Sequence, residues 1–167
     1  MILRLCIQNG VMGDTQKEIV VLYVDDEINN LTAFKATFRR LFRIFTAPSA
    51  IEARKILEQN KVHVLISDQR MPAMTGIEFF ESIIQRHPEP IRILLTGYAD
   101  INAVIDAINK GHVYKYISKP WDEEEMKKHI EKAYHIYTLR KERKELTDKL
   151  LDVNQKLEFL VRQRLLS

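Results

Sequence analysis

The sequence predicts an α/β fold, in which helices cover both faces of a five-stranded parallel sheet and a long helix follows. Five short apolar runs, rich in Val, Ile, Tyr and Phe, alternate with segments of helical periodicity. The runs are nearly continuous rather than alternating, which is typical of parallel strands buried on both faces. No Gly or Pro occurs between residues 122 and 167, so one uninterrupted helix is expected there. This order of elements predicts an open, doubly wound sheet.

Each predicted element has its own signal in the sequence. The β-branched and aromatic runs predict strands at 19–24, 43–47, 62–67, 91–96 and 113–118. Apolar residues at helical spacing predict helices at 28–41, 49–59, 77–86 and 100–109, with Leu41, Ile51, Ile101 and Ile105 among the residues expected to face the sheet. The last of these helices has Asp100 as its expected N-cap and Gly111 after its end.

The composition excludes several classes of protein. The chain has 167 residues with 26 basic and 23 acidic side chains, and its net charge of +3 is too small to indicate nucleic-acid binding. Cys6 is the only cysteine, so no internal disulfide can form and a cytoplasmic location is expected. No apolar stretch reaches the length of a membrane span, so no membrane association is expected. We expect a disordered leader at 1–17, one globular domain at 18–135 and a helical extension at 136–167.

Charged and polar side chains occur at the points where the predicted strands end. Asp25 and Asp26 follow the first strand, and Asp68 follows the third. Thr96 ends the fourth strand, and Lys119 follows the fifth. In a parallel sheet these ends share one edge, which is where such folds place their sites. Taken singly, the acids could cap a helix or a turn, the threonine could begin a loop and the lysine could be an ordinary surface residue.

Taken together, these side chains suit the transfer of a phosphoryl group. Clustered carboxylates repel one another unless a cation lies between them. Mg²⁺ prefers hard oxygen ligands and takes one or two carboxylates directly while keeping several waters. The lysine adds a second positive charge, and the threonine hydroxyl can donate a hydrogen bond to an incoming oxygen. The sequence therefore predicts a magnesium-dependent phosphoryl acceptor, in which positioning and charge neutralisation do most of the work.

Four stretches of the sequence carry a resemblance to a known family: "VLYVDDE", "VLISDQRMPAMTGIEFF", "RILLTGYAD" and "VYKYISKPW". In order and spacing, the region from about 19 to 135 resembles the receiver domain of response regulators in two-component signalling. The resemblance implies a flavodoxin-like sheet with strand order 2-1-3-4-5. The style of the last two stretches is similar to that of receivers found ahead of HD-GYP, PP2C-like, nucleotide cyclase or hydrogenase-regulator output domains.

The resemblance implies a role for each residue of the expected metal site. Asp68 is the phosphoacceptor, which becomes an aspartyl phosphate, and it also contacts the metal. Asp26 binds Mg²⁺ directly, Asp25 holds it through water, and the backbone carbonyl of Arg70 is a further ligand. Arg70 and Tyr98 are large side chains beside the expected phosphoryl group, and we expect them to shield it from the water that would hydrolyse it.

The resemblance also implies a switch and a partner. Thr96 and Lys119 contact the phosphoryl oxygens, and Tyr116 is the aromatic side chain that rotates when Thr96 is drawn toward the phosphate. The Lys119–Pro120 peptide is expected to be cis. The implied partner is a sensor histidine kinase or a phosphotransfer protein. Beyond Mg²⁺-dependent self-phosphorylation and autodephosphorylation, no enzymatic activity is expected.

The last helix carries a heptad pattern from residue 136 onward. Apolar residues occupy seven of the nine a and d positions, and the exceptions are Arg143 and Arg164 at a positions. This pattern predicts a coiled coil and a homodimer. The alternative is a single amphipathic helix that packs against something else. The mixed charge of this segment gives no reason to expect direct nucleic-acid binding.

Two functions fit the whole sequence. In the first, the chain is a phosphorylation-dependent response regulator whose coiled coil transmits the phosphorylation state to an output domain or partner. In the second, it is a stand-alone receiver that acts as a phosphorelay intermediate or as a protein-interaction dimer. The reading frame past Ser167 would separate them, because a further domain favours the first and a stop codon favours the second.

Overall fold

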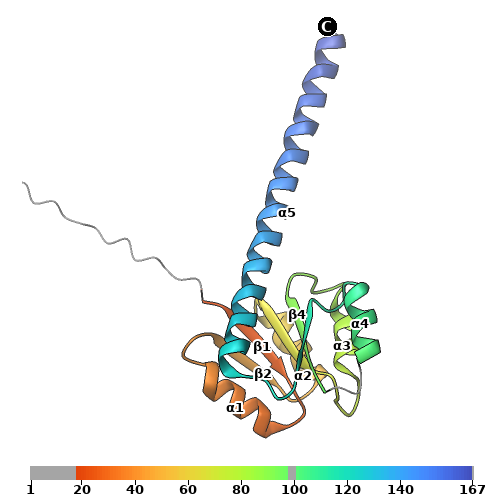
Figure 1. The fold of residues 1–167 in the computed structure, drawn as a ribbon. Coiled ribbons are helices and arrows are strands. Elements are labelled where there is room, and N and C mark those ends of the chain that lie inside the picture. Colours follow the sequence, from red (N-terminus) through yellow and green to blue (C-terminus); the bar gives the residue numbers. More distant parts are fainter. Residues whose placement is uncertain (1–17, 98–100, 167) are drawn as a thin grey trace, which may run out of the picture.

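The computed structural model describes residues 18–97 and 101–166, which form one parallel sheet between two layers of helices, with a long helix leaving the domain (Figure 1). The five strands lie in the order β2-β1-β3-β4-β5, so the predicted fold class is confirmed. The strands are β1 (Val20–Val24), β2 (Arg43–Ala47), β3 (Val64–Asp68), β4 (Ile91–Thr96) and β5 (Lys115–Ser118). The helices are α1 (Ile28–Phe38), α2 (Ala50–Gln59), α3 (Gly76–Ile83), α4 (Ile101–Asn109) and α5 (Glu123–Leu166).

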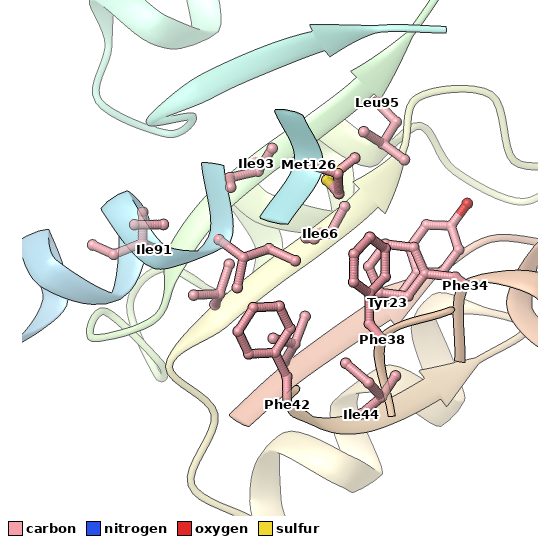
Figure 2. Packing of buried hydrophobic residues seen from close by; sticks show 14 of the residues in the cluster. Tyr23, Phe34, Phe38, Phe42, Ile44, Ile66, Ile91, Ile93, Leu95 and Met126 are labelled. Atoms are coloured by element: carbon pink, nitrogen blue, oxygen red, sulfur yellow. The ribbon is translucent and has the colours of Figure 1, made fainter. Parts of the chain in front are cut away.

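The sheet separates two hydrophobic clusters, which explains why its strands are apolar on both faces. Alternate side chains of each central strand point to opposite sides, so Tyr23 of β1 joins one cluster and Leu22 joins the other. The first cluster packs against α1 and α5, and the second against α2, α3 and α4. Figure 2 shows the first cluster, in which the aromatic rings of α1 lie beside the ring of Tyr23 and the strand residues Ile66 and Ile93 lie nearby.

Aromatic rings connect β1, α1 and the loop after β5. The ring of Phe34 lies 4.5 Å from that of Tyr23 and 5.8 Å edge-on from that of Trp121, measured between ring centroids. Trp121 also packs 6.0 Å from Phe38. Each such pair contributes about 0.5–1.5 kcal/mol beyond the area it buries. Because Trp121 comes two residues after Lys119, this packing fixes the loop that carries the lysine.

Several residues expected in the core are exposed instead. Helix α1 ends at Phe38, so Leu41 lies beyond it and is 50% exposed. Ile51 is exposed on α2, and Ile101 and Ile105 are exposed on α4. These short helices bury only a narrow stripe of side chains, which on α4 consists of Val104 and Ala107. Asp68 is the last residue of β3 rather than the first residue after it. The expected cap Asp100 and the leader at 1–17 lie outside the described residues, whereas Gly111 follows α4 with the positive φ of 77° expected after a helix end.

Helix α5 belongs to the domain only over its first part. Met126, Ile130, Ala133 and Tyr137 are buried against the sheet. From residue 139 to 166 every residue is exposed, and Figure 1 shows this part extending away from the domain as a single rod. The helix is continuous across residue 135, which is the boundary expected from the sequence between the globular domain and its extension.

Helix α3 begins in direct contact with the end of β3. Thr75 and Glu78 form a capping box at its N-terminus, in which each side chain accepts a hydrogen bond from the other residue's backbone N–H. The next residue, Gly76, is buried, and a Cβ atom at this position would overlap the backbone carbonyl of Asp68 and lie 2.7 Å from a methyl carbon of Leu94. The glycine therefore allows α3 to approach the strand end that carries Asp68.

We predict that Gly76→Ala lowers the free energy of unfolding by about 1–3 kcal/mol, because the added methyl group overlaps backbone that cannot move aside cheaply. Gly97→Ala is the matched control, because nothing lies within 4 Å of a Cβ built there. Urea unfolding of both variants measures the difference. Equal stability of the two variants would contradict the close approach of α3 to β3.

Candidate functional site

The ends of four strands form one edge of the sheet, and the residues expected at the site lie along it. The ladder pairs Asp68 of β3 with Leu95 of β4, and Thr96 of β4 with Ser118 of β5. The backbone N–H of Lys119 then donates to the carbonyl of Thr96 at 3.0 Å, which continues the ladder by one residue. The parallel register therefore fixes which residue of each strand reaches this edge.

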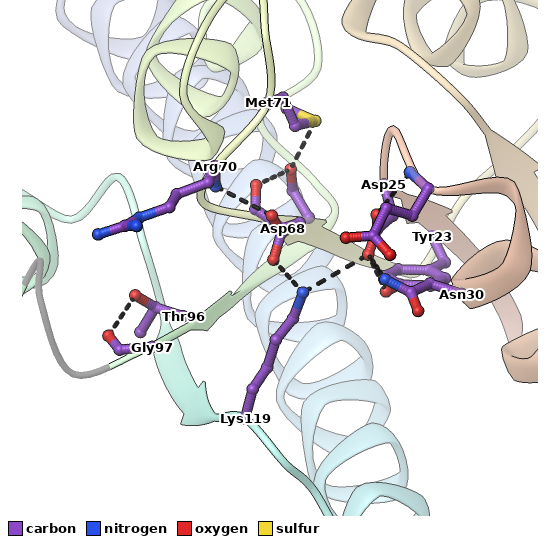
Figure 3. Close-up of polar contacts among 11 residues, drawn as sticks. Tyr23, Asp25, Asn30, Asp68, Arg70, Met71, Thr96, Gly97 and Lys119 are labelled. Atoms are coloured by element: carbon purple, nitrogen blue, oxygen red, sulfur yellow. Dashed lines mark hydrogen bonds and ion pairs between the residues drawn. The ribbon is translucent and has the colours of Figure 1, made fainter.

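The ammonium group of Lys119 lies between two buried carboxylates (Figure 3). Its Nζ atom is 2.5 Å from Oδ1 of Asp68 and 3.6 Å from Oδ2 of Asp25. Two carboxylates this well buried would repel each other, and the cation between them offsets that repulsion. Burial alone would lower the pKa of Lys119, but its hydrogen bond to Asp68 and the charges of Asp68, Asp25 and Glu27 outweigh it and raise the pKa above its usual value.

Asp25 is held by hydrogen bonds from three directions besides the lysine. Its Oδ2 atom accepts from the hydroxyl of Tyr23 at 2.5 Å and from the side-chain amide of Asn30 at 3.1 Å. Its Oδ1 atom accepts from the backbone N–H of Glu27 at 2.9 Å. Burial, together with the hydrogen bond to Asp25 and its charge, strongly raises the pKa of Tyr23, so that the phenol stays a donor.

Tyr23 and Asn30 are the residues of the site that sequence reasoning missed. The signal for Tyr23 was present, because alternate residues of a strand share a face and Tyr23 stands two positions before Asp25. Asn30 lies in the first turn of α1. Its side-chain direction depends on how that helix packs, which the residue pattern alone does not give.

Asp68 is anchored by the loop that follows it. Its Oδ2 atom accepts from the backbone N–H of Arg70 at 3.0 Å, while its backbone carbonyl accepts from the hydroxyl of Ser67 at 2.9 Å. The loop is closed by the side-chain carbonyl of Gln69, which accepts from the backbone N–H of Ile77 at 3.2 Å. Asp68 thus presents one oxygen to a backbone donor and the other to the lysine.

Among the described residues, Thr96, Tyr116 and Asp26 make no hydrogen bond or ion pair with these carboxylates. Thr96 is buried, and its hydroxyl donates to the carbonyl of Gly97 at 2.9 Å. Tyr116 is half-buried and packs against the cluster on the α4 side. Asp26 is exposed to solvent at the start of the loop after β1. The Lys119–Pro120 peptide is cis, as the resemblance implies, whereas Tyr98 lies outside the described residues.

The oxygen atoms at this edge fit a magnesium ion better than a softer metal. Over residues 18–97 and 101–166, no group of three or more His, Cys, Asp or Glu side chains is close enough to hold a metal by side chains alone. Mg²⁺ does not need such a cage, because it binds one or two carboxylates and fills its octahedron with carbonyl oxygens and water. The ligands that the resemblance implies, Asp26, Asp68 and the carbonyl of Arg70, are oxygen donors of this kind. The donor set therefore matches the chemistry of the expected ion.

We predict that the contribution of Lys119 to stability is lost at alkaline pH. Because its pKa is raised in the folded protein, the ion pair contributes fully below the unfolded lysine pKa of about 10.4 and fades as the pH rises through the higher folded value. Urea unfolding of the wild type and of Lys119→Gln should differ by a constant amount from neutral pH to about pH 10, and the difference should shrink as the pH rises through the raised pKa of Lys119. A difference that stays constant up to pH 11 would contradict the ion pair.

Comparison with known proteins identifies the family of this arrangement. The family model of the response regulator receiver domain matches residues 21–131. The chain is 42% identical over 107 residues to the hydrogenase transcriptional regulatory protein HoxA of Cupriavidus necator, a match that covers 64% of this chain and 22% of that protein. The chain therefore spans about a quarter or less of the length of the curated regulators it matches. In the described part of the chain, no helix has both the length and the apolar character needed to cross a bilayer.

Many solved structures have a similar fold, and two of them illustrate the match. One is an adenylate cyclase structure from Rhodopirellula baltica, with a TM-score of 0.76 and 28% identity over 79% of this chain and 98% of that one. The other is the beryllofluoride-activated NtrC4 receiver domain dimer, with a TM-score of 0.65 and 28% identity over 71% of this chain and 98% of that one. The matched region contains Asp25, Asp68 and Lys119, whose side chains meet at the edge of the sheet. The chain belongs to the response regulator receiver domain family.

Proposed function

We propose that this receiver domain accepts a phosphoryl group on Asp68 from a sensor histidine kinase or a phosphotransfer protein. The observation that carries the proposal is the contact between Lys119 and Asp68 beside the buried, hydrogen-bonded Asp25. The lysine is already within reach of the group that would become phosphorylated, and its raised pKa keeps it charged. We also propose that the protein acts in the cytoplasm, because a chain with a single cysteine suits a reducing compartment.

The proposed reaction is a direct transfer. A carboxylate oxygen of Asp68 forms a bond to phosphorus while the bond from phosphorus to the donor's histidine nitrogen breaks, and that nitrogen leaves with the electron pair. Lys119 neutralises charge on the phosphoryl oxygens, and the backbone N–H of Arg70 is placed to donate to the carboxylate. Mg²⁺, held by Asp26, Asp68 and the Arg70 carbonyl and through water by Asp25, would supply further positive charge.

Phosphorylation would act on the rest of the domain through Thr96. Among the described residues, the hydroxyl of Thr96 donates only to the carbonyl of its neighbour Gly97, so a phosphoryl oxygen can compete for it. Movement of Thr96 toward Asp68 would free space at the end of β4 for Tyr116, which is half-buried beside Ile108 in a depression of about 550 Å³. The added charge of about −1.5 to −2 drives this exchange of hydrogen bonds.

The exposed part of α5 is the proposed route to a partner or output domain, and we propose that it pairs two copies of the chain. Its apolar seam is exposed to solvent and comprises Leu139, Leu146, Leu150, Val153, Leu157 and Leu160. At about 100° per residue, this seam lies roughly opposite the face of α5 that packs on the sheet. Pairing through the seam therefore leaves the domain's own packing intact and buries an apolar strip that soluble proteins rarely expose.

We predict that Asp68→Asn abolishes labelling by acetyl phosphate in the presence of Mg²⁺, because the amide oxygen carries no charge and is a poor nucleophile. Intact-mass spectrometry of the wild type should show one added phosphoryl group, which disappears when EDTA is added. Asp148→Asn, on the exposed part of α5, is the matched control and should be labelled normally. Labelling of the Asp68→Asn protein at the wild-type level would assign the phosphoryl group to another residue.

We predict that Leu150→Lys weakens or abolishes a dimer, whereas Leu151→Lys does not. The two leucines are neighbours and are exposed to a similar degree, 66% and 55%, but only Leu150 lies on the seam. Burying two opposed lysines at an a position costs far more than placing them on the outer surface. Light scattering of the full chain and of a version ending at Thr138 measures the mass. A dimer that survives removal of the residues after Thr138 would place the interface on the receiver itself.

A further inference from the structure

Asp25 is surrounded by donors that occupy most of its acceptor positions. Its two oxygens accept hydrogen bonds from Tyr23, Asn30 and the backbone of Glu27, and Oδ2 also faces the ammonium of Lys119. A carboxylate offers about four lone-pair positions, so the protein engages nearly all of them. By contrast, Asp26 next to it is exposed to solvent. The two neighbouring acids are therefore prepared for different tasks by what surrounds them.

The donor from Tyr23 is held in place by packing. Its side chain is 1% exposed, and its ring lies against Phe34, which in turn packs against Trp121. The phenol cannot turn away without disturbing this aromatic packing. At 2.5 Å from Oδ2, it makes the shortest of the hydrogen bonds to Asp25. A short bond from a buried donor to a carboxylate is one of the stronger kinds of hydrogen bond in proteins.

We propose that Tyr23 and Asn30 are positioning residues that turn Asp25 away from direct coordination and weaken its attraction for a divalent cation, so that they set the magnesium affinity of the site. The proposal rests on the proposed phosphoacceptor function. Its physical basis is that each donor spreads the negative charge of the carboxylate and occupies a lone pair that could otherwise point at the metal. Removing a donor therefore strengthens, rather than weakens, the attraction of Asp25 for Mg²⁺.

The test uses Tyr23→Phe in the full chain, because phenylalanine keeps the ring and removes only the hydroxyl. Trp121 is the only tryptophan of the chain, and it lines a cavity of about 420 Å³ together with Tyr23, Asn30 and Lys119, so its fluorescence can follow a magnesium titration. Loss of one charge-assisted hydrogen bond should tighten Mg²⁺ binding by about threefold to tenfold. The Mg²⁺ concentration for half-maximal labelling by acetyl phosphate should fall by the same factor.

Three further variants complete the test. Asn30→Ala removes the other side-chain donor to Asp25, so it should also tighten Mg²⁺ binding. Because Asn30 is only half-buried, this variant can replace Tyr23→Phe if the latter folds poorly. Tyr137→Phe removes the hydroxyl of another buried tyrosine, one that packs on His63 away from the site, and should leave the affinity unchanged. Asp26→Ala should weaken binding, because it removes a direct ligand.

Each outcome decides between the two proposals. Unchanged or weaker Mg²⁺ binding in both Tyr23→Phe and Asn30→Ala, with normal binding by the wild type, overturns the positioning role and leaves the phosphoacceptor function standing. A wild-type protein that shows no Mg²⁺ binding overturns both. If Tyr23→Phe is less stable but binds Mg²⁺ with unchanged affinity, Tyr23 serves only to stabilise the fold.

Discussion

The contact on which the site depends is the ion pair between Lys119 and the carboxylates of Asp25 and Asp68. Two buried carboxylates at one edge of a sheet repel each other, and the domain tolerates them because a cation that follows another strand lies between them. The lysine is also only half-buried, so water can reach it, as could the phosphoryl group of the proposed transfer. A fully enclosed ion pair would not permit the proposed transfer. The geometry thus combines a stable ion pair with access from solvent.

The rest of the fold can be understood as the support of this contact. The parallel ladder brings the strand ends to one edge in a fixed register, and the carbonyl of Thr96 holds the backbone of Lys119. On the other side, the absence of a side chain at Gly76 lets α3 pack against the carbonyl of Asp68. The aromatic packing around Phe34 joins β1 to the loop after β5. Lys119 and the two carboxylates are therefore each held in position by their own packing and hydrogen bonds.

Much of this could be predicted from the sequence, because the topology of a parallel sheet determines which residues meet. The convergence of Asp25, Asp68 and Lys119 follows from their places at strand ends, and the structure brings them together. The direction of an individual side chain does not follow in this way. Asn30 reaches Asp25 only because α1 packs at a particular angle, and Ile51 is exposed although its spacing fits the buried stripe. Periodicity gives the face of a helix, whereas the width of the buried part depends on the neighbouring elements.

The uninterrupted course of α5 has a mechanical consequence. The part beyond Tyr137 is about 44 Å long at 1.5 Å per residue, and it is continuous with the turns that pack on the sheet. A stiff rod of this length is a lever arm, since a tilt of about 5° at its base displaces its far end by about 4 Å, which approaches the 5.4 Å pitch of one helical turn. A small rearrangement at the sheet can therefore leave the fold unchanged and still move the far end of α5. The movement there is comparable to the spacing between neighbouring side chains.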